Sequence, residues 1–183
     1  MVGLLFAIEH PNRVDRLVLS NTTPGFVLEE AGDFALPVTA GAYTEAMAAA
    51  EQGLPEGVRR MSELMYSPAA VEQAPSIVDD AVECCFGPVF AQSPEARTAN
   101  WTAYGAFNVR DRLSEIQSPT LVMTSSSDRI GSPAQAWTMW NEIPRSTLIA
   151  LDGIGHDWMA EAPVLGSRLV TMFINGEMDP TYK

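Results

Sequence analysis

The sequence feature that most constrains the fold is a strand–helix–strand pattern near the C-terminal end. Two short apolar runs, Thr120–Thr124 and Ser146–Leu151, are rich in Leu, Ile and Val and end at polar or glycine-containing residues. Such runs are typical of buried parallel strands. A helix is expected between them over Pro133–Ile143, because Ser132 suits the N-cap position and the proline suits the first helical position. The pattern therefore predicts a right-handed β–α–β crossover.

One acid and one histidine stand directly after the two expected strands. Asp128 lies in the loop after the first strand, and His156 lies in the loop after the second. Because parallel strands end at the same edge of a sheet, both loops are expected at its carboxyl edge. A carboxylate can orient an imidazole there, while the second ring nitrogen takes a proton from a nucleophile. The alternative is that Asp128 is a turn residue and His156 a loop residue bonded to the backbone.

The two loops resemble those of the α/β-hydrolase family. Residues 119–133 read PTLVMTSSSDRIGSP and residues 148–163 read LIALDGIGHDWMAEAP, with the acid before the histidine as that fold requires. The resemblance implies that His156 is a general base and Asp128 its orienting partner, with no cofactor and no metal. It also implies an aromatic residue beside the substrate pocket at Trp158, for which simple packing is the alternative.

The N-terminal segment resembles the part of the same family that follows the nucleophile turn. Residues 3–22 read GLLFAIEHPNRVDRLVLSNT, which predicts a helix over Gly3–Glu9 and a strand over Val14–Ser20. Aligned on Gly3, Met1 stands where the family has the residue after the nucleophilic serine, whose backbone N–H is an oxyanion donor. Val2 departs from the pattern, because the family has a small glycine there.

The sequence contains no Gly-x-Ser-x-Gly motif. Three serines lie close to Asp128, but Ser125, Ser126 and Ser127 are turn residues on the wrong loop for a nucleophile. We therefore expect the nucleophile to lie outside these residues. The fold class is an incomplete α/β-hydrolase fold that begins just after the nucleophile turn.

The middle of the chain reads as helices without a convincing strand. Helical segments are expected over Val38–Gly53, Pro55–Tyr66 and Ala74–Gln92, and another begins at Ser93 with Pro94 in its first position. The resemblance implies that residues 24–108 form a helical cap, and that residues 1–23 and 109–183 form the hydrolase core. In a last helix after Pro163, helical spacing predicts that five residues face the sheet. They are Val164, Leu165, Leu169, Met172 and Phe173.

Composition narrows the classes of partner. The net charge is −12, which argues against nucleic acid and anionic membranes as partners. No apolar run approaches the 18 or so residues of a membrane span, and the N-terminus lacks the basic start of a signal peptide. The adjacent Cys84 and Cys85 predict no disulfide framework, and no Cys and His spacing matches a zinc site. A cytoplasmic location is expected.

The function implied by the resemblance is hydrolysis of a small ester, lactone or related acyl substrate by a serine hydrolase. Because the nucleophile is missing, we expect the isolated chain to be inactive. The alternative is a non-catalytic binding or regulatory remnant of a hydrolase. The strand over Val14–Ser20 lacks its usual neighbour. The chain is therefore also expected to be marginally stable, to self-associate through an exposed sheet edge, or to be stabilised by another chain.

Overall fold

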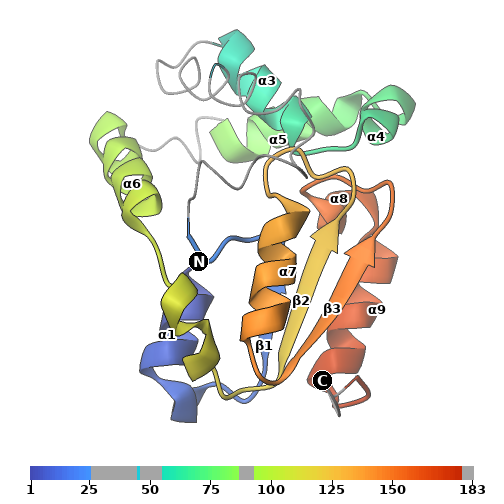
Figure 1. Cartoon of the computed structure of the whole chain (residues 1–183). Helices are drawn as coiled ribbons and strands as arrows, with labels where there is room; N and C mark the ends of the chain where they lie inside the picture. The colour runs from blue at the N-terminus through green and yellow to red at the C-terminus, as the bar shows by residue number, and fades with distance from the viewer. Residues whose placement is uncertain (26–44, 46–54, 87–92, 179–183) are drawn as a thin grey trace.

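The computed structural model of the chain describes residues 1–25, 45, 55–86 and 93–178. These residues form a parallel sheet with helices on both faces and a group of helices above one end of its strands (Figure 1). The elements, in chain order, are α1 (Val2–Glu9), η1 (Pro11–Arg13), β1 (Leu17–Ser20), α3 (Pro55–Leu64), α4 (Pro68–Gln73), α5 (Ser76–Phe86), α6 (Pro94–Ala106), η3 (Arg110–Glu115), β2 (Thr120–Ser125), α7 (Pro133–Glu142), β3 (Ser146–Leu151), α8 (Trp158–Glu161) and α9 (Pro163–Ile174).

The described sheet has three strands in the order β1-β2-β3. Both pairings are parallel, with Leu17 opposite Thr120 and Thr120 opposite Ser146. All six residues of β2 are buried, because this central strand has a neighbour on each side and helices on each face. The expected β–α–β crossover is therefore present as β2, α7 and β3. The three strands also end at one common carboxyl edge.

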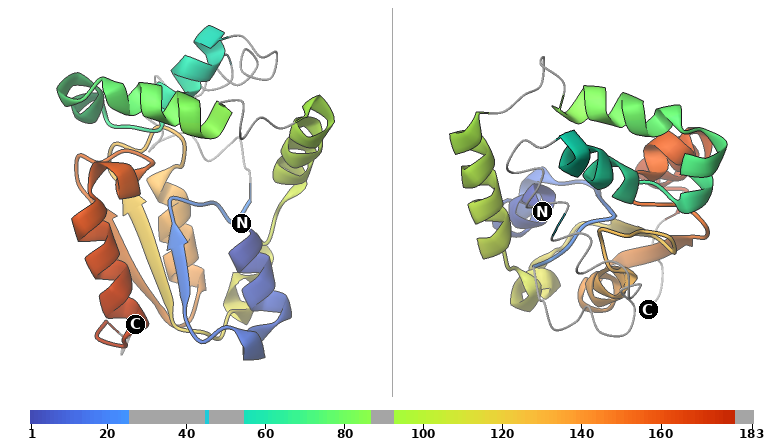
Figure 2. Two further views of the ribbon diagram at one scale, coloured as in Figure 1. Left: turned by 180° about the vertical axis from the view of Figure 1, so that it is seen from behind. Right: turned by 90° about the horizontal axis from the view of Figure 1, so that it is seen from above.

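Alternate residues along the strands build two separate cores. Leu17, Leu19 and Val122 pack with α1, η3 and α7 on one face. Leu121 and Met123 pack with α8 and α9 on the other face. Figure 2 shows the resulting layers, with α9 on one side of the sheet and α1 and α7 on the other. This alternation is what a parallel sheet covered on both faces requires.

Helices α3, α4 and α5 lie over the carboxyl edge of the sheet, and α6 lies to one side of them (Figure 1). Tyr66, Val78 and Ala81 form a small apolar cluster of their own, apart from the two cores of the sheet. The end of α5 agrees with the predicted helix only as far as Phe86, because residues 87–92 lie outside the described part of the chain. The predicted helix over Val38–Gly53 also lies outside it.

Strand β1 and helix α4 differ from the sequence-based expectation. The strand predicted from Val14 begins only at Leu17, whose N–H makes the first bond to β2 by donating to the carbonyl of Pro119 at 2.9 Å. Val14 instead closes the 3₁₀ turn by donating to the carbonyl of Pro11. The short helix α4 was not predicted, although Ser67 is its N-cap and accepts a hydrogen bond from the N–H of Ala70.

The face that α9 turns to the sheet was also predicted wrongly in part. Phe173 is fully buried and Leu169 packs in the same core, as expected. Val164, Leu165 and Met172 are instead exposed, at 64%, 45% and 39%. The face of α9 that packs inward instead contains residues 166, 169, 170 and 173. Gly166 belongs to this face because its missing side chain lets the helix approach the ring of Trp158 directly.

Candidate active site

Asp128 and His156 meet at the carboxyl edge of the sheet. Nδ1 of His156 lies 2.9 Å from Oδ2 and 3.1 Å from Oδ1 of Asp128. The Asp128 side chain is completely buried, whereas 24% of the His156 side chain is exposed. The carboxylate therefore holds one ring nitrogen inside the protein, and Nε2 is the nitrogen left to exchange a proton with another group.

The loop after β2 holds the Asp128 carboxylate from behind. Its Oδ1 accepts hydrogen bonds from the backbone N–H groups of Ile130 and Gly131, both at 2.8 Å. A Cβ at position 131 would lie 3.0 Å from Oδ2 of the same carboxylate, so glycine leaves room for it. These donors fix the orientation of the carboxylate and stabilise its negative charge.

The loops that carry the acid and the histidine are joined to each other and to the end of β1. Ser126 donates its N–H to the carbonyl of Leu151 at 2.9 Å, and Ser127 donates to the carbonyl of Ile154 at 3.1 Å. Asn21, directly after β1, donates from its side-chain amide to the carbonyl of His156 at 2.5 Å. No sequence signal singled out Asn21, because its partners lie more than a hundred residues away along the chain.

The corner between α3 and α4 rests on these same loops. Arg129 donates from Nη2 to the carbonyls of Glu63 and Tyr66, the latter at 2.8 Å. Glu161 accepts from the N–H of Ser67 at 2.8 Å and from its hydroxyl at 2.7 Å. Burial lowers the pKa of the Arg129 guanidinium, and the carboxylates of Glu63 and Glu161 oppose that change. Two side chains of opposite charge thus attach this corner to the acid loop and to α8, the helix after the histidine loop.

Gly155, just before His156, makes the closest backbone approach in this region. A Cβ there would lie 2.5 Å from the nitrogen of Ser67 and 2.6 Å from the carbonyl carbon of Tyr66. Gly155 also donates its N–H to Glu161 at 3.0 Å. A glycine is required at this position because the α3–α4 corner packs directly on the backbone beside the histidine.

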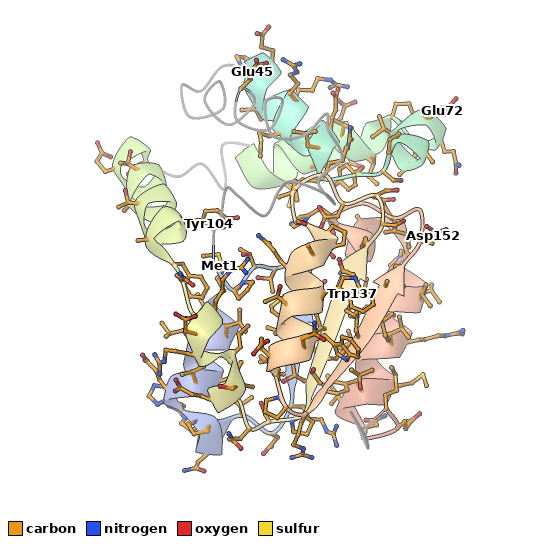
Figure 3. The ribbon with its side chains drawn as sticks, in the orientation of Figure 1. Met1, Glu45, Glu72, Tyr104, Trp137 and Asp152 are labelled. Atoms are coloured by element: carbon orange, nitrogen blue, oxygen red, sulfur yellow. The ribbon has the colours of Figure 1, made fainter. Side chains whose placement is uncertain are left out.

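Tyr104 brings α6 into the electrostatic surroundings of Asp128. Burial raises the pKa of the Tyr104 hydroxyl, and the negative charge of Asp128 raises it further. Figure 3 shows Tyr104 on the side of α6 that faces the sheet. From the sequence, Tyr104 had two open interpretations, a residue that faces substrate and a residue that packs in the core.

The other predicted site residues have definite positions. The amino group of Met1 donates to Oγ1 of Thr22 at 3.1 Å, beside the end of β1, and burial lowers its pKa. Trp158 is 4% exposed in the core beneath α9 and donates its indole N–H to the hydroxyl of Ser20. Trp158 thus packs in the core, as in the alternative stated from the sequence, and its place beside a substrate pocket stays a prediction.

Of the three serines near Asp128, Ser126 and Ser127 lie in the turn after β2 as predicted, whereas Ser125 is not a turn residue but the last residue of that strand. Ser125 is buried at the end of β2 and its hydroxyl oxygen lies 3.2 Å from the amide nitrogen of Asn21. Ser126 donates its hydroxyl to the carboxylate of Asp152 at 2.7 Å. Neither hydroxyl has a hydrogen bond to His156 among the described contacts.

Within the described residues, no cluster of three or more His, Cys, Asp or Glu side chains is arranged to bind a metal ion. In the same part of the chain, every helix is too short or too polar to span a bilayer.

Comparison with known proteins places the fold. No protein-family model and no curated protein sequence matches the chain. Among solved structures, MGS-M2, an α/β-hydrolase enzyme from a Medee basin deep-sea metagenome library, has a TM-score of 0.73 at 18% identity over 100% of this chain. Est816, described as an N-acyl homoserine lactone degrading enzyme, has a TM-score of 0.73 at 25% identity over 94% of this chain. The enol-lactonase from Burkholderia xenovorans has a TM-score of 0.69 at 19% identity, also over 94% of this chain.

The similarity extends over nearly all of this chain but over only part of each similar structure. The chain covers 63% of MGS-M2, 63% of Est816 and 61% of the enol-lactonase. Three parallel strands, helices on both faces and an acid–histidine pair at the carboxyl edge agree with that likeness. The chain therefore has the fold of the α/β-hydrolase superfamily, in incomplete form.

Proposed function

We propose that this chain carries the acid–base part of a serine hydrolase site. The observation that supports this most directly is the 2.9 Å contact between Nδ1 of His156 and Oδ2 of Asp128. The pair lies at the carboxyl edge of a parallel sheet, where open α/β folds place their chemistry. His156 is the general base, and Asp128 orients it and stabilises the imidazolium that forms.

The proposed reaction is acyl transfer in two halves. Nε2 of His156 takes the proton of a serine hydroxyl as the oxygen attacks the substrate carbonyl, and the same proton then passes to the leaving oxygen as the C–O bond breaks. Water repeats the sequence on the acyl-enzyme and frees the acid. The serine comes from polypeptide outside these 183 residues, immediately before the position of Met1, whose nitrogen then serves as an oxyanion donor.

The substrate class that we favour is a small ester, lactone or related acyl compound. Two of the similar structures are described as acting on lactones, Est816 and the enol-lactonase. In a lactone the leaving oxygen stays attached to the acyl group, so the product is a single hydroxy acid.

We assign residues 24–108 to a cap, and residues 1–23 and 109–183 to the core. The position of α3, α4 and α5 over the strand ends supports this division (Figure 1). So does the separate apolar cluster around Tyr66 and Val78. In such an arrangement, the cap helices and the acid and histidine loops enclose the substrate between them.

A binding or regulatory role without catalysis is the second candidate. The observation that favours it is that the printed sequence holds no Gly-x-Ser-x-Gly motif. The isolated chain is inactive in both accounts, so the two differ in what precedes Met1 in the gene. An in-frame Gly-x-Ser directly upstream supports the hydrolase, and a stop codon there supports the binding role.

The decisive assay uses protein expressed from a reading frame that includes the segment upstream of Met1, with an activated ester such as p-nitrophenyl acetate as substrate. We expect turnover that is lost in His156→Ala and kept in His10→Ala. The second variant is a matched control, because His10 is an exposed histidine at the end of α1. Equal rates in all three proteins would refute a catalytic role for His156.

We also propose that the chain self-associates through β1. This strand is at the edge of the described sheet, and it pairs only with β2 among the described strands. Its Leu17 and the following Asn21 donate toward β2, so the intervening Val18 and Ser20 direct their backbone groups to the outside. An open edge of this kind offers hydrogen bonds to another strand.

A further inference from the structure

Asn21 has an unusual backbone conformation at the end of β1. Its φ is +39°, and it is the one non-glycine residue in the described part of the chain with a positive φ. Residues other than glycine seldom take this left-handed conformation, although asparagine tolerates it better than most. Such positions concentrate at functional sites, where the surrounding structure holds them in place.

The side chain of Asn21 lies between the acid loop and the histidine loop. Its amide nitrogen is 2.5 Å from the carbonyl oxygen of His156, 3.3 Å from that of Gly155 and 3.2 Å from the hydroxyl oxygen of Ser125. Its backbone N–H donates to the carbonyl of Met123 at 3.0 Å, which fixes Asn21 to β2. The shortest of these contacts is the one to the backbone carbonyl of His156.

The backbone of Asn21 also lies near the loop that holds the acid. A Cβ at Gly131 would lie 3.5 Å from the backbone oxygen of Asn21, and Gly131 donates to the Asp128 carboxylate. Asn21 therefore bonds to the backbone of His156 on one side and to the hydroxyl of Ser125, just before the acid loop, on the other. Ser125 is buried at the end of β2, so the amide of Asn21 can hold both loops at a fixed separation.

We propose that Asn21 is a positioning residue for the Asp128–His156 pair. By binding the carbonyl of His156, it fixes the backbone from which the imidazole projects, and so keeps Nδ1 within reach of Asp128. This inference rests on the proposed function, in which the orientation of that imidazole matters. Asn21 does not touch substrate and acts only through His156.

A purely structural reading of Asn21 is that it supplies a left-handed residue to turn the chain after β1. Asn21→Gly separates the two roles, because glycine adopts a φ of +39° without strain but has no amide. Asn21→Asp is a second variant that keeps the size and the turn tendency of asparagine. Its carboxylate would face the carbonyls of Gly155 and His156 and repel them.

The test is the tautomer of the His156 ring, read from the ¹⁵N chemical shifts of the imidazole in the neutral form. The chain has two histidines, so His10 serves as an internal reference. In the wild-type protein we expect the proton on Nδ1, facing Asp128. In Asn21→Gly and Asn21→Asp we expect the ratio of the Nδ1–H to the Nε2–H form to fall about tenfold, the effect of losing one hydrogen bond. The His10 signals should not change.

Two further variants make each outcome decisive. Asp128→Asn removes the carboxylate and shows the tautomer ratio of a ring without its partner. Asn175→Gly, at the exposed end of α9, controls for loss of stability without a change near the pair. An unchanged tautomer in both Asn21 variants would overturn the positioning role and leave the Asp128–His156 pair intact. A wild-type ring with its proton on Nε2 would overturn the pair, and the role of Asn21 with it.

Discussion

Glu161 accepts two hydrogen bonds from Ser67, one from the backbone N–H at 2.8 Å and one from the hydroxyl at 2.7 Å. The two residues are 94 positions apart and come from the histidine side of the core and from the α3–α4 corner. Ser67 is also the N-cap of α4, so the same contact ties the start of a helix to the core. Together with the bonds from Arg129, this contact attaches the helices above the sheet to the core.

We predict that Glu161→Gln weakens that attachment. The amide keeps one acceptor oxygen but loses the charge that strengthens both bonds, at a cost of about 1–3 kcal/mol in the free energy of unfolding. Faster amide hydrogen exchange in α3 and α4, with β2 unchanged, is the expected signature. Glu177→Gln is the matched control, because Glu177 is exposed and accepts a long 3.4 Å hydrogen bond from the side-chain amide of Asn175. Equal exchange in the two variants would show that Glu161 does not anchor the corner.

Two helical glycines are predicted to respond in opposite directions to alanine. A Cβ at Gly166 would lie 1.6 Å from Cζ3 of Trp158, so Gly166→Ala forces the indole or α9 to move. We expect a loss of about 1–3 kcal/mol or more. A Cβ at Gly105 in α6 meets nothing within 4 Å, so Gly105→Ala should gain about 0.5–1 kcal/mol. Urea unfolding measures both, and a neutral Gly166→Ala would contradict the packing described for Trp158.

The ionisation of Tyr104 provides a pH-dependent prediction. Its pKa is raised by burial and by Asp128, so the folded state holds the phenolic proton more tightly than the unfolded state does. This contribution to stability is present below the ordinary tyrosine pKa of about 10 and is lost as pH rises through the higher, folded value. We expect Tyr104→Phe to flatten the fall in unfolding free energy above about pH 10.

The share of that effect due to Asp128 can be measured separately. In Asp128→Asn, the negative charge is gone and burial remains, so the pKa of Tyr104 should fall toward its ordinary value without reaching it. Absorbance at 295 nm, corrected with Tyr104→Phe, follows this hydroxyl among the four tyrosines. A pKa of Tyr104 unaffected by Asp128→Asn would show that α6 does not lie within the influence of the site.

Self-association through β1 predicts sedimentation that depends on protein concentration, together with binding of a hydrophobic dye. Val18→Pro should reduce the association, because proline removes an N–H that points away from β2. Val18→Ala is the control, since it loses similar packing against the α9 side of the sheet but keeps the N–H. A wild-type protein that sediments as a single monomer and binds no dye would disprove the proposed edge contact.

The part of the fold that the sequence predicted best is the β2–α7–β3 unit. Its signals are local, since apolar runs mark the strands and Ser132 with Pro133 marks the helix start, where Ser132 indeed accepts from the N–H of Ala134. The start of α6 at Ser93 and Pro94 was predicted for the same reason. Helix α4 has an equivalent signal at Ser67 and Pro68, but its six residues are too few to show a periodic apolar face.

Features that depend on distant contacts were not predictable. The exposure of Val164 and Leu165 follows from how α9 seats on Trp158, which helical spacing alone does not reveal. Asn21, Arg129 and Glu161 act through backbone groups of remote segments, so their residue types gave no indication. Asp128 and His156 were accessible to sequence reasoning because each lies in the loop that follows a strand, in a family-like context.

The most direct test of the account is the effect of Asp128→Asn on ester hydrolysis. The protein to be assayed is the one expressed from a reading frame that includes the segment upstream of Met1. An asparagine preserves the shape of the buried side chain but cannot hold His156 in the catalytic tautomer or stabilise its imidazolium. We predict that kcat falls by about 10⁴ with little change in KM. A kcat within about twofold of wild type would contradict the assignment of Asp128 and His156 as the acid–base pair, because losing a triad member has a far larger effect.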